Sequence, residues 1–396
     1  MAKNIIFCAD GTWNRPDQDA EEDLDTGADP TNVYKFFFSL AGKIAEENSS
    51  KEIEKTLLDN NGDVRQVAKY IHGVGDSRSE LAKLVGGVFG VGVVSRIVRG
   101  YTYISRQFEP GDEILILGFS RGAYTARALA SFILKQGLLP KDVASSSDKK
   151  SAYAAGFKSW AAYRRSCGFY FDDVGTFVAQ IGELFRRSPV HIDVEKIKAV
   201  GVWDTVGAVG LPLVKDGRRI DTFKFADTKL HAGIEYGFHA VSLDEERTAY
   251  VPTLWDPVDH RIEQLLFAGA HADVGGGYSI NRSQYGAGLS DIALGWMQNC
   301  FEKIGVIFKP AGERFMPFIE DSAGVAHEEW VNLPWLKLPV ARRVFPLNLV
   351  KLHASVRERI GKKVIHGDSE IVYSPKGFPA GFFDIESLST EETVAE

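Results

Sequence analysis

Gly118-Phe119-Ser120-Arg121-Gly122 is the stretch that decides how this chain folds. The apolar run 113–117 before it predicts a buried strand, and the run 123–130 after it predicts a helix. A serine flanked by glycines between a strand and a helix is typical of a nucleophile elbow, in which the serine occupies a sharp, strained turn. We therefore predict that Ser120 is a nucleophile. The alternative is a tight turn with an inert serine.

The composition sets the outer bounds of the fold. With 396 residues the chain can form one elaborated domain or two. A hydrophobic content of 44% and a charged content of 25% are those of a soluble globular protein. The net charge of −7 creates no basic field that would attract nucleic acid, so we expect no nucleic-acid partner.

The cysteines and the N-terminus bear on the compartment. Cys8, Cys167 and Cys300 are scattered and odd in number, which argues against a disulfide framework and favours a reducing compartment. Only five apolar residues separate Asn4 from Asp10, too few for the core of a cleaved signal peptide. We expect a cytoplasmic protein, or one exported without a cleaved signal peptide.

Further apolar runs predict strands elsewhere in the chain, at residues 5–9, 67–71, 197–203 and 265–270. Helical stretches lie between them, so we predict an α/β fold with a mostly parallel central sheet flanked by helices. In such sheets reactive groups gather at the carboxyl ends of the strands. Asp10, Ser120, Asp204 and His271 all follow predicted strands, and we expect them at one edge of the sheet.

The order of residues along the chain suggests a catalytic triad. In α/β-hydrolases the nucleophile is followed by the acid and then by the histidine. Asp204 follows the run 197–203, and His271 enters the glycine-rich stretch 271–278. In this assignment His271 takes the proton of Ser120, while Asp204 orients the imidazole and stabilises its charged form.

Other residues compete for these roles. His239 is the nearest rival to His271, although its apolar surroundings favour a core histidine, and His353 lies on a predicted helix at 349–360. Asp273 is the alternative acid, but it is only two residues from His271. Asp10, Asp204, His271 and Asp273 could outline a metal site, but no ligand spacing requires one. We expect neither a metal nor a cofactor.

Backbone groups near Ser120 are candidates for an oxyanion hole. The residue after the nucleophile, Arg121, usually donates its N–H. Gly11 or Thr12, which follow the first predicted strand, would provide the second N–H. The alternative for this second group is a plain turn fixed by Asp10.

The chain divides into a core and two additions. We predict a catalytic core at 1–300, with an insertion at 141–195 that forms a helical cap over the serine. Residues 301–396 form a C-terminal extension packed on the core. Within it, residues 335–366 hold eight Lys or Arg and one acid, a net charge of +7. This stretch is either a solvated basic face or a contact with an anionic membrane.

Several segments together resemble a family of α/β-hydrolase domains of formerly unknown function, which includes type VI secretion phospholipase effectors. The matching segments span roughly residues 3–300 and contain Asp10-Gly11-Thr12, Gly118-Phe119-Ser120-Arg121-Gly122, Trp203-Asp204-Thr205, His239-Ala240-Val241 and His271-Ala272-Asp273. The resemblance implies the triad Ser120, Asp204 and His271.

We therefore expect a serine hydrolase that cleaves acyl esters through an acyl-enzyme, most like a phospholipase or lipase. Its partner would be a lipid or another acyl ester. One alternative is a soluble esterase or thioesterase on small acyl substrates, because specificity depends on the cap and pocket. Another is a catalytically silent hydrolase fold that serves in binding. The sequence does not indicate the oligomeric state.

Overall fold

The structure is a computed structural model of the 396-residue chain. It describes residues 2–11, 30–45, 52–73, 89–146, 148–167, 190–206, 213–215, 218–220, 229–256, 258–278, 288–315, 318–331, 339–345 and 351–375.

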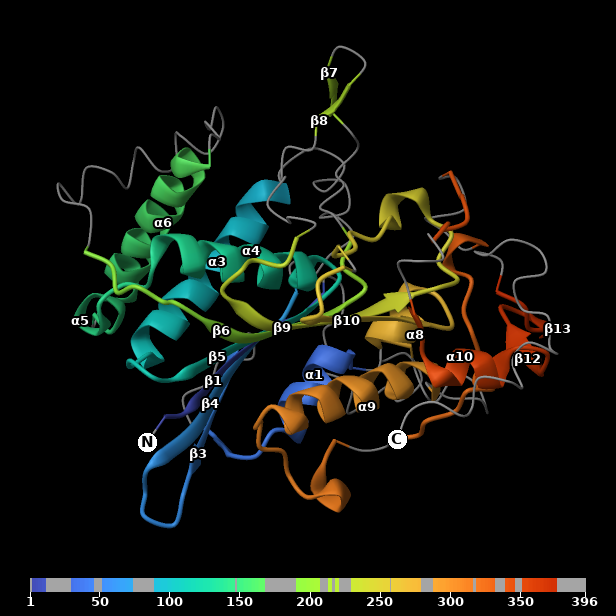
Figure 1. Cartoon of the computed structure of the whole chain (residues 1–396), viewed down its shortest axis with the longest axis horizontal. Coiled ribbons are helices and arrows are strands. Elements are labelled where there is room, and N and C mark those ends of the chain that lie inside the picture. Colours follow the sequence, from blue (N-terminus) through green and yellow to red (C-terminus); the bar gives the residue numbers. More distant parts are fainter. Residues whose placement is uncertain are drawn as a thin grey trace, which may run out of the picture.

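A nine-stranded sheet forms the centre of the molecule, in the order β11-β10-β9-β6-β5-β1-β4-β3-β2 (Figure 1). All neighbours from β11 to β4 pair in parallel, whereas β3 pairs antiparallel with both β4 and β2. The predicted α/β fold with a mostly parallel sheet is confirmed. The strands are β1 (Asn4–Ala9), β2 (Lys43–Ile44), β3 (Glu52–Leu58), β4 (Val64–Ile71), β5 (Glu113–Phe119), β6 (Ile197–Trp203), β9 (Ile234–Ser242), β10 (Ile262–Phe267) and β11 (Lys351–Leu352).

The central strands are apolar because both faces of the sheet are covered. In β1, Ile5, Phe7 and Ala9 enter the core on one face, while Ile6 and Cys8 enter the core on the other. This alternation is the expected geometry of a strand.

Helices cover the two faces (Figure 1). One face carries α3 (Phe89–Gln107), α4 (Arg121–Gln136), α5 (Lys141–Ala144) and α6 (Lys149–Ser166). The other face carries α1 (Asn32–Ser39) and α9 (Gly288–Lys303), whose aromatic residues pack with those of the sheet. The shorter helices are α8 (His271–Gly275), α10 (Ala354–Arg359) and the 3₁₀ turns Thr248–Tyr250, Ala311–Glu313 and Glu329–Val331. The described part of the chain also contains two hairpins, β7 (Leu213–Lys215) with β8 (Arg218–Ile220) and β12 (Lys363–His366) with β13 (Ser369–Val372).

The predicted strands at 5–9, 67–71, 113–117 and 197–203 fall within β1, β4, β5 and β6. The strand predicted at 265–270 ends earlier, because β10 stops at Phe267 and Gly269 turns the chain at φ +99°. The helix predicted at 349–360 is shorter: β11 precedes it and α10 begins at Ala354. The sequence did not identify β9, which lies between β6 and β10.

Within the predicted insertion at 141–195, α6 packs against α3 and α4. A cap over the serine stays a prediction, and residues 168–189 lie outside the described residues. The C-terminal residues Phe345, Val356 and Tyr373 share a buried cluster with Val241 of β9 and Leu266 of β10. The domain boundary at residue 300 also stays a prediction.

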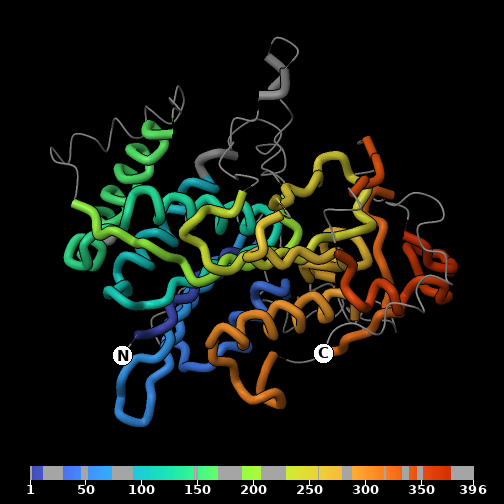
Figure 2. Tube along the Cα trace, in the orientation of Figure 1, coloured from blue at the N-terminus to red at the C-terminus, as the bar shows by residue number. Residues whose placement is uncertain are grey.

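The C-terminal segment 339–345 has no regular structure, yet its path is fixed by the core. It runs beside the segment that carries Arg247, with an antiparallel bridge between Arg247 and Val340 (Figure 2). The Ala341 N–H donates to the carbonyl of Glu246 at 2.7 Å. These contacts bring residue 343 to the carboxyl edge of the sheet.

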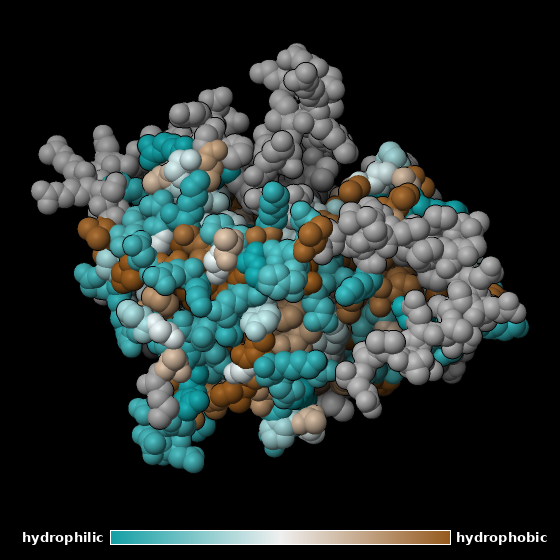
Figure 3. All heavy atoms as spheres, in the orientation of Figure 1, coloured by the Kyte–Doolittle hydropathy of each residue, from teal (hydrophilic) through white to brown (hydrophobic). Residues whose placement is uncertain are grey.

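Among the described residues on the face in Figure 3, hydrophilic side chains predominate, with smaller hydrophobic areas between them. Among the described residues, no helix has both the length and the apolar character that a membrane span requires.

Candidate active site

Ser120 occupies the turn between β5 and α4 in a strained conformation, with φ 56° and ψ −119°. The flanking glycines are required by space. A Cβ on Gly122 would lie 2.0 Å from the carbonyl oxygen of Ala9, and one on Gly118 would lie 2.2 Å from the carbonyl oxygen of Gly122. The glycines therefore let the turn pass close to the end of β1, as the elbow motif predicts.

Asp204 follows β6 and is the second strained residue. Among the described residues, Ser120 and Asp204 are the only non-glycine residues with positive φ, and that of Asp204 is 37°. Such strain is found preferentially at functional sites. The two turns are adjacent, because the Ser120 N–H donates to the carbonyl of Trp203 at 3.0 Å.

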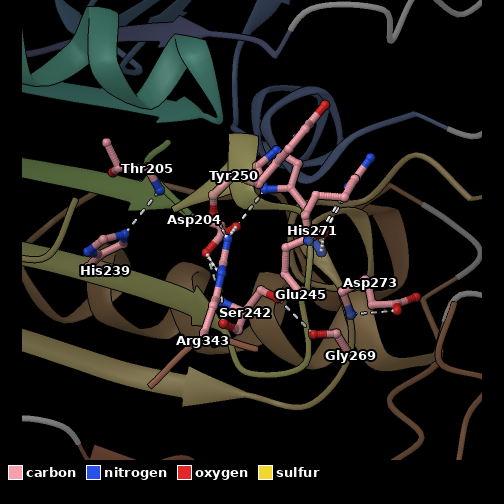
Figure 4. A network of polar contacts seen from close by, with 12 residues as sticks. Asp204, Thr205, His239, Ser242, Glu245, Tyr250, Gly269, His271, Asp273 and Arg343 are labelled. Carbon is pink, nitrogen blue, oxygen red and sulfur yellow. Dashed lines mark hydrogen bonds and ion pairs between the residues drawn. The ribbon is translucent and has the colours of Figure 1, made fainter. Parts of the chain in front are cut away.

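The structure brings His271 to Asp204. The Nδ1 atom of His271 lies 2.5 Å from Oδ2 of Asp204, and both side chains are buried (Figure 4). The imidazole packs between two rings, those of Phe119 and Tyr250, at centroid distances of 4.6 and 4.8 Å. His271 was predicted to enter a glycine-rich loop, but it is instead the first residue of the short helix α8.

Arg343 is a component of this site that the sequence did not reveal. Its Nη1 donates to Oδ1 of Asp204 at 2.7 Å, and its Nη2 donates to Oδ2 at 2.9 Å. It also donates to the carbonyls of Ser242 and Tyr250 (Figure 4). In the sequence it belonged to a predicted basic surface. That prediction is wrong for Arg343 and for Arg359, which are both buried as counter-charges or donors to backbone carbonyls.

The surroundings leave one of the two partners charged and the other neutral. Burial penalises the Asp204 carboxylate, but Arg343 and the hydrogen bond from His271 outweigh it and hold the pKa of Asp204 well below its usual range. Burial lowers the pKa of His271 below its usual value, although Asp204 opposes this shift. Near neutral pH the site therefore holds an ionised carboxylate beside a neutral imidazole, the state of a general base.

The rival histidines are occupied elsewhere. The Nε2 atom of His239 accepts from the Thr205 N–H at 3.1 Å, and Nδ1 lies 2.9 Å from Oε1 of Gln264. Burial lowers the pKa of His239 to about 3, so it is a neutral core histidine. His353 caps α10, with Nδ1 2.9 Å from Oγ of Ser355.

The alternative acid, Asp273, is bonded to a different histidine. Its Oδ1 lies 2.6 Å from Nδ1 of His327, and its Oδ2 accepts from the Ala270 and His327 N–H groups. Within the described parts of the chain, no group of three or more His, Cys, Asp or Glu side chains could hold a metal ion.

The predicted oxyanion donors differ in whether their N–H groups are available to a substrate. Arg121 is the first residue of α4, so its N–H lies at the helix N-terminus beside Ser120. Gly11 is also close, since a Cβ on it would lie 3.5 Å from Cβ of Ser120. However, the Gly11 N–H donates to Oδ1 of Asp10 at 2.6 Å. Thr12 lies outside the described residues.

Asp10 anchors this end of β1. Its carboxylate accepts from Oγ1 of Thr31 at 2.8 Å and from the Tyr70 hydroxyl at 2.5 Å, and Arg96 donates to its backbone carbonyl. Burial raises the pKa of Asp10 to about 6. Within the described residues, Asp10 therefore fixes the end of β1 and engages the Gly11 N–H, and an oxyanion role for Gly11 or Thr12 stays a prediction.

Comparisons with known proteins include a curated relative and a solved structure. The chain is 27% identical over 275 residues to the Uncharacterized protein YEL023C of Saccharomyces cerevisiae, which covers 65% of this chain and 33% of the yeast protein. It thus spans about a third of that relative's length. The crystal structure of an uncharacterized protein from Pseudomonas aeruginosa aligns with a TM-score of 0.43 and 17% identity, over 81% of this chain and 49% of that one.

A family model described as "T6SS, Phospholipase effector Tle1-like, catalytic domain" matches residues 3–300. The match covers the two strained turns, at Ser120 and Asp204, and helix α8. It confirms the resemblance found in the sequence. The chain belongs to the family of T6SS Tle1-like phospholipase effector catalytic domains.

Proposed function

We propose that the chain is a serine hydrolase of the α/β-hydrolase type that cleaves acyl ester bonds of phospholipids. The observation that carries the proposal is the buried Asp204–His271 bond of 2.5 Å at the sheet edge where Ser120 sits strained. Membership of a phospholipase effector family supports the substrate class.

The first step is acylation. Because Asp204 holds Nδ1 of His271, the opposite ring nitrogen, Nε2, takes the proton from the Ser120 hydroxyl. The Ser120 oxygen then attacks the acyl carbonyl. The tetrahedral intermediate collapses as His271 returns the proton to the leaving alcohol, a lysophospholipid, and an acyl-Ser120 ester remains.

The second step restores the enzyme. Water loses a proton to Nε2 of His271 and attacks the acyl-Ser120 carbonyl, which releases a fatty acid and regenerates the hydroxyl. In both steps the negative charge on the acyl oxygen faces the N-terminus of α4. The Arg121 N–H is the donor that we assign there, because it follows the nucleophile directly.

The surface next to the site also favours contact with an anionic bilayer. Arg342 is exposed beside the buried Arg343, and Val340 and Val344 on the same segment are 51% and 83% exposed. Further exposed cations of the region are Lys351, Arg357, Lys362 and Lys363. Cations attract anionic lipid by about 1 kcal/mol each, and neighbouring apolar side chains can enter the interface.

The test is hydrolysis of defined phospholipid vesicles by the purified chain, with Ser120→Ala as control. We expect equal amounts of fatty acid and lysophospholipid, and neither product from the variant. Turnover of short-chain water-soluble esters or thioesters without any turnover of vesicles would support the small-substrate esterase instead. Binding to vesicles without turnover of any ester would support the silent fold.

The same assay tests the membrane contact. Replacing Arg342, Lys362 and Lys363 by Gln is expected to slow hydrolysis of vesicles that contain anionic lipid and to leave neutral vesicles unaffected. Equal rates of the variant and the original chain on anionic vesicles would remove the basic surface from the proposal.

A further inference from the structure

We propose that Arg343 is a positioning residue of the active site, which keeps Asp204 ionised and aimed at His271. This inference rests on the proposed function, because it assigns Arg343 a task in the same reaction. Arg343 lies outside residues 3–300 that the family model matches, so part of the site comes from the C-terminal segment.

The geometry is that of a two-point clamp. The side chain of Arg343 is 5% exposed and that of Asp204 is fully buried. The guanidinium meets both carboxylate oxygens, at 2.7 and 2.9 Å, which fixes the plane of the carboxylate. Oδ1 also accepts from the Ser242 N–H at 3.0 Å. With its plane fixed, Oδ2 faces Nδ1 of His271.

Arg343 also joins the elements that surround the imidazole. It donates to the carbonyl of Ser242 at the end of β9 and to the carbonyl of Tyr250. The ring of Tyr250 packs edge-on against His271. A single side chain therefore ties together Asp204, the end of β9 and one wall of the imidazole site.

The charge of Arg343 has a catalytic consequence. An isolated carboxylate in a fully buried site would be protonated or would hold its histidine as a cation. Arg343 and Asp204 together carry no net charge. His271 therefore stays unprotonated down to a lower pH than it would beside an unpaired carboxylate. Loss of this positive charge favours proton uptake by both Asp204 and His271. Both effects move the acidic limb of the pH–rate profile, where activity falls as the pH is lowered, towards higher pH.

The other ionisable groups near Asp204 and His271 are either paired with an opposite charge or neutral. Glu245 accepts from the His271 N–H at 3.1 Å and is paired with Arg247 at 2.8 Å. His239 lies beyond Thr205 with its pKa lowered to about 3 by burial, so it carries no charge. Tyr250, against the imidazole, has its pKa raised by burial and is neutral as well. Among the described residues, Arg343 is thus the arginine or lysine that directly contacts Asp204.

The test follows the rate at which Ser120 reacts with a fluorophosphonate probe as the pH is lowered. For Arg343→Gln we expect the acidic limb of the pH–rate profile to move to higher pH by about one pH unit, since an unpaired Asp204 carboxylate favours proton uptake by the histidine that it holds. Arg343→Lys keeps the positive charge but loses the two-point contact with the carboxylate. Its acidic limb should therefore stay near that of the original chain, while the rate of the reaction with the probe falls. Should Arg343→Gln fail to fold, Arg343→Met gives the same comparison with Lys.

Arg359→Gln is the matched control. Like Arg343, Arg359 is a buried arginine of the C-terminal region, and it donates to the carbonyls of Ser322 and Gly324. Its loss should lower stability without moving the acidic limb. An unmoved limb in Arg343→Gln, or an equal displacement in Arg343→Lys, would overturn the proposal. If the original chain does not react at all, the proposed hydrolase function fails instead.

Discussion

Two Asp–His pairs meet at helix α8, and they have almost the same length. His271 begins the helix and lies 2.5 Å from Asp204, while Asp273, two residues later, lies 2.6 Å from His327. The surroundings differ. The side chain of His271 is 7% exposed and that of His327 is 33% exposed.

The surroundings move the two histidines in opposite directions. Burial lowers the pKa of His271, and its partner Asp204 also forms an ion pair with Arg343. For His327 burial also opposes the charge, but the bond to Asp273 outweighs it and raises the pKa. The first pair thus favours a neutral imidazole, and the second favours the charged form of its histidine. A short Asp–His distance does not by itself identify a catalytic base, because burial and the other partners of the acid decide the charge.

The largest effect should separate the two histidines in catalysis. We expect His271→Ala to lower turnover by about 10⁴-fold or more, and Asp204→Asn to be nearly as severe, because the members of a triad act as a unit. His327→Ala should reduce turnover by less than about 10-fold, since the Asp273–His327 contact only anchors the loop before His271. The measurement is kcat/KM on an acyl ester, with the folded state checked by circular dichroism.

The opposite ranking would exchange the roles of the two pairs. His239 is bonded within the core, so we expect it to take no part in catalysis. A large loss of turnover in His239→Ala with a preserved fold would therefore likewise require a new triad.

A smaller effect should appear in the pH dependence of stability. Because the pKa of His327 is raised in the folded chain, its ion pair stabilises fully below the unfolded value of about 6.5 and loses its effect as the pH rises through the folded pKa. With a third of the side chain exposed, we expect at most about 1 kcal/mol. The difference in free energy of unfolding between the original chain and His327→Gln should therefore be larger at acidic than at alkaline pH.

His353→Gln provides the control with the opposite sign, since burial lowers the pKa of His353. Its difference in unfolding free energy should not shrink as the pH rises. A pH-independent difference for His327→Gln would mean that this histidine carries no extra charge in the folded chain.

The sequence predicted those parts of the site that depend on local pattern. The turn at Ser120 was predicted because a strand, two glycines and a helix surround it, and the structure places Ser120 on such a sharp turn. Asp204 was found because β6 is an unbroken apolar run that ends at Trp203. Parallel strands then bring their ends to one edge, which is why residues far apart in the chain could be expected together.

The remaining features depend on contacts that no local pattern records. Arg343 meets Asp204 across 139 positions of the sequence, and beside Arg342 it resembles an ordinary surface cation. The strand β9 was missed because His239 and Ser242 interrupt its apolar pattern, and both are satisfied only by bonds to other segments. The start of α8 at His271 likewise depends on Asp273, which accepts from the Ala270 N–H.

The most direct test of the central claim is to map the adduct of a fluorophosphonate probe by mass spectrometry of the intact chain and its peptides. We predict one adduct per chain, on Ser120, with no adduct in Ser120→Ala and a greatly slowed reaction in His271→Ala but not in His327→Ala. An adduct on another residue, or undiminished labelling of Ser120→Ala, would contradict the assignment of Ser120 as the nucleophile.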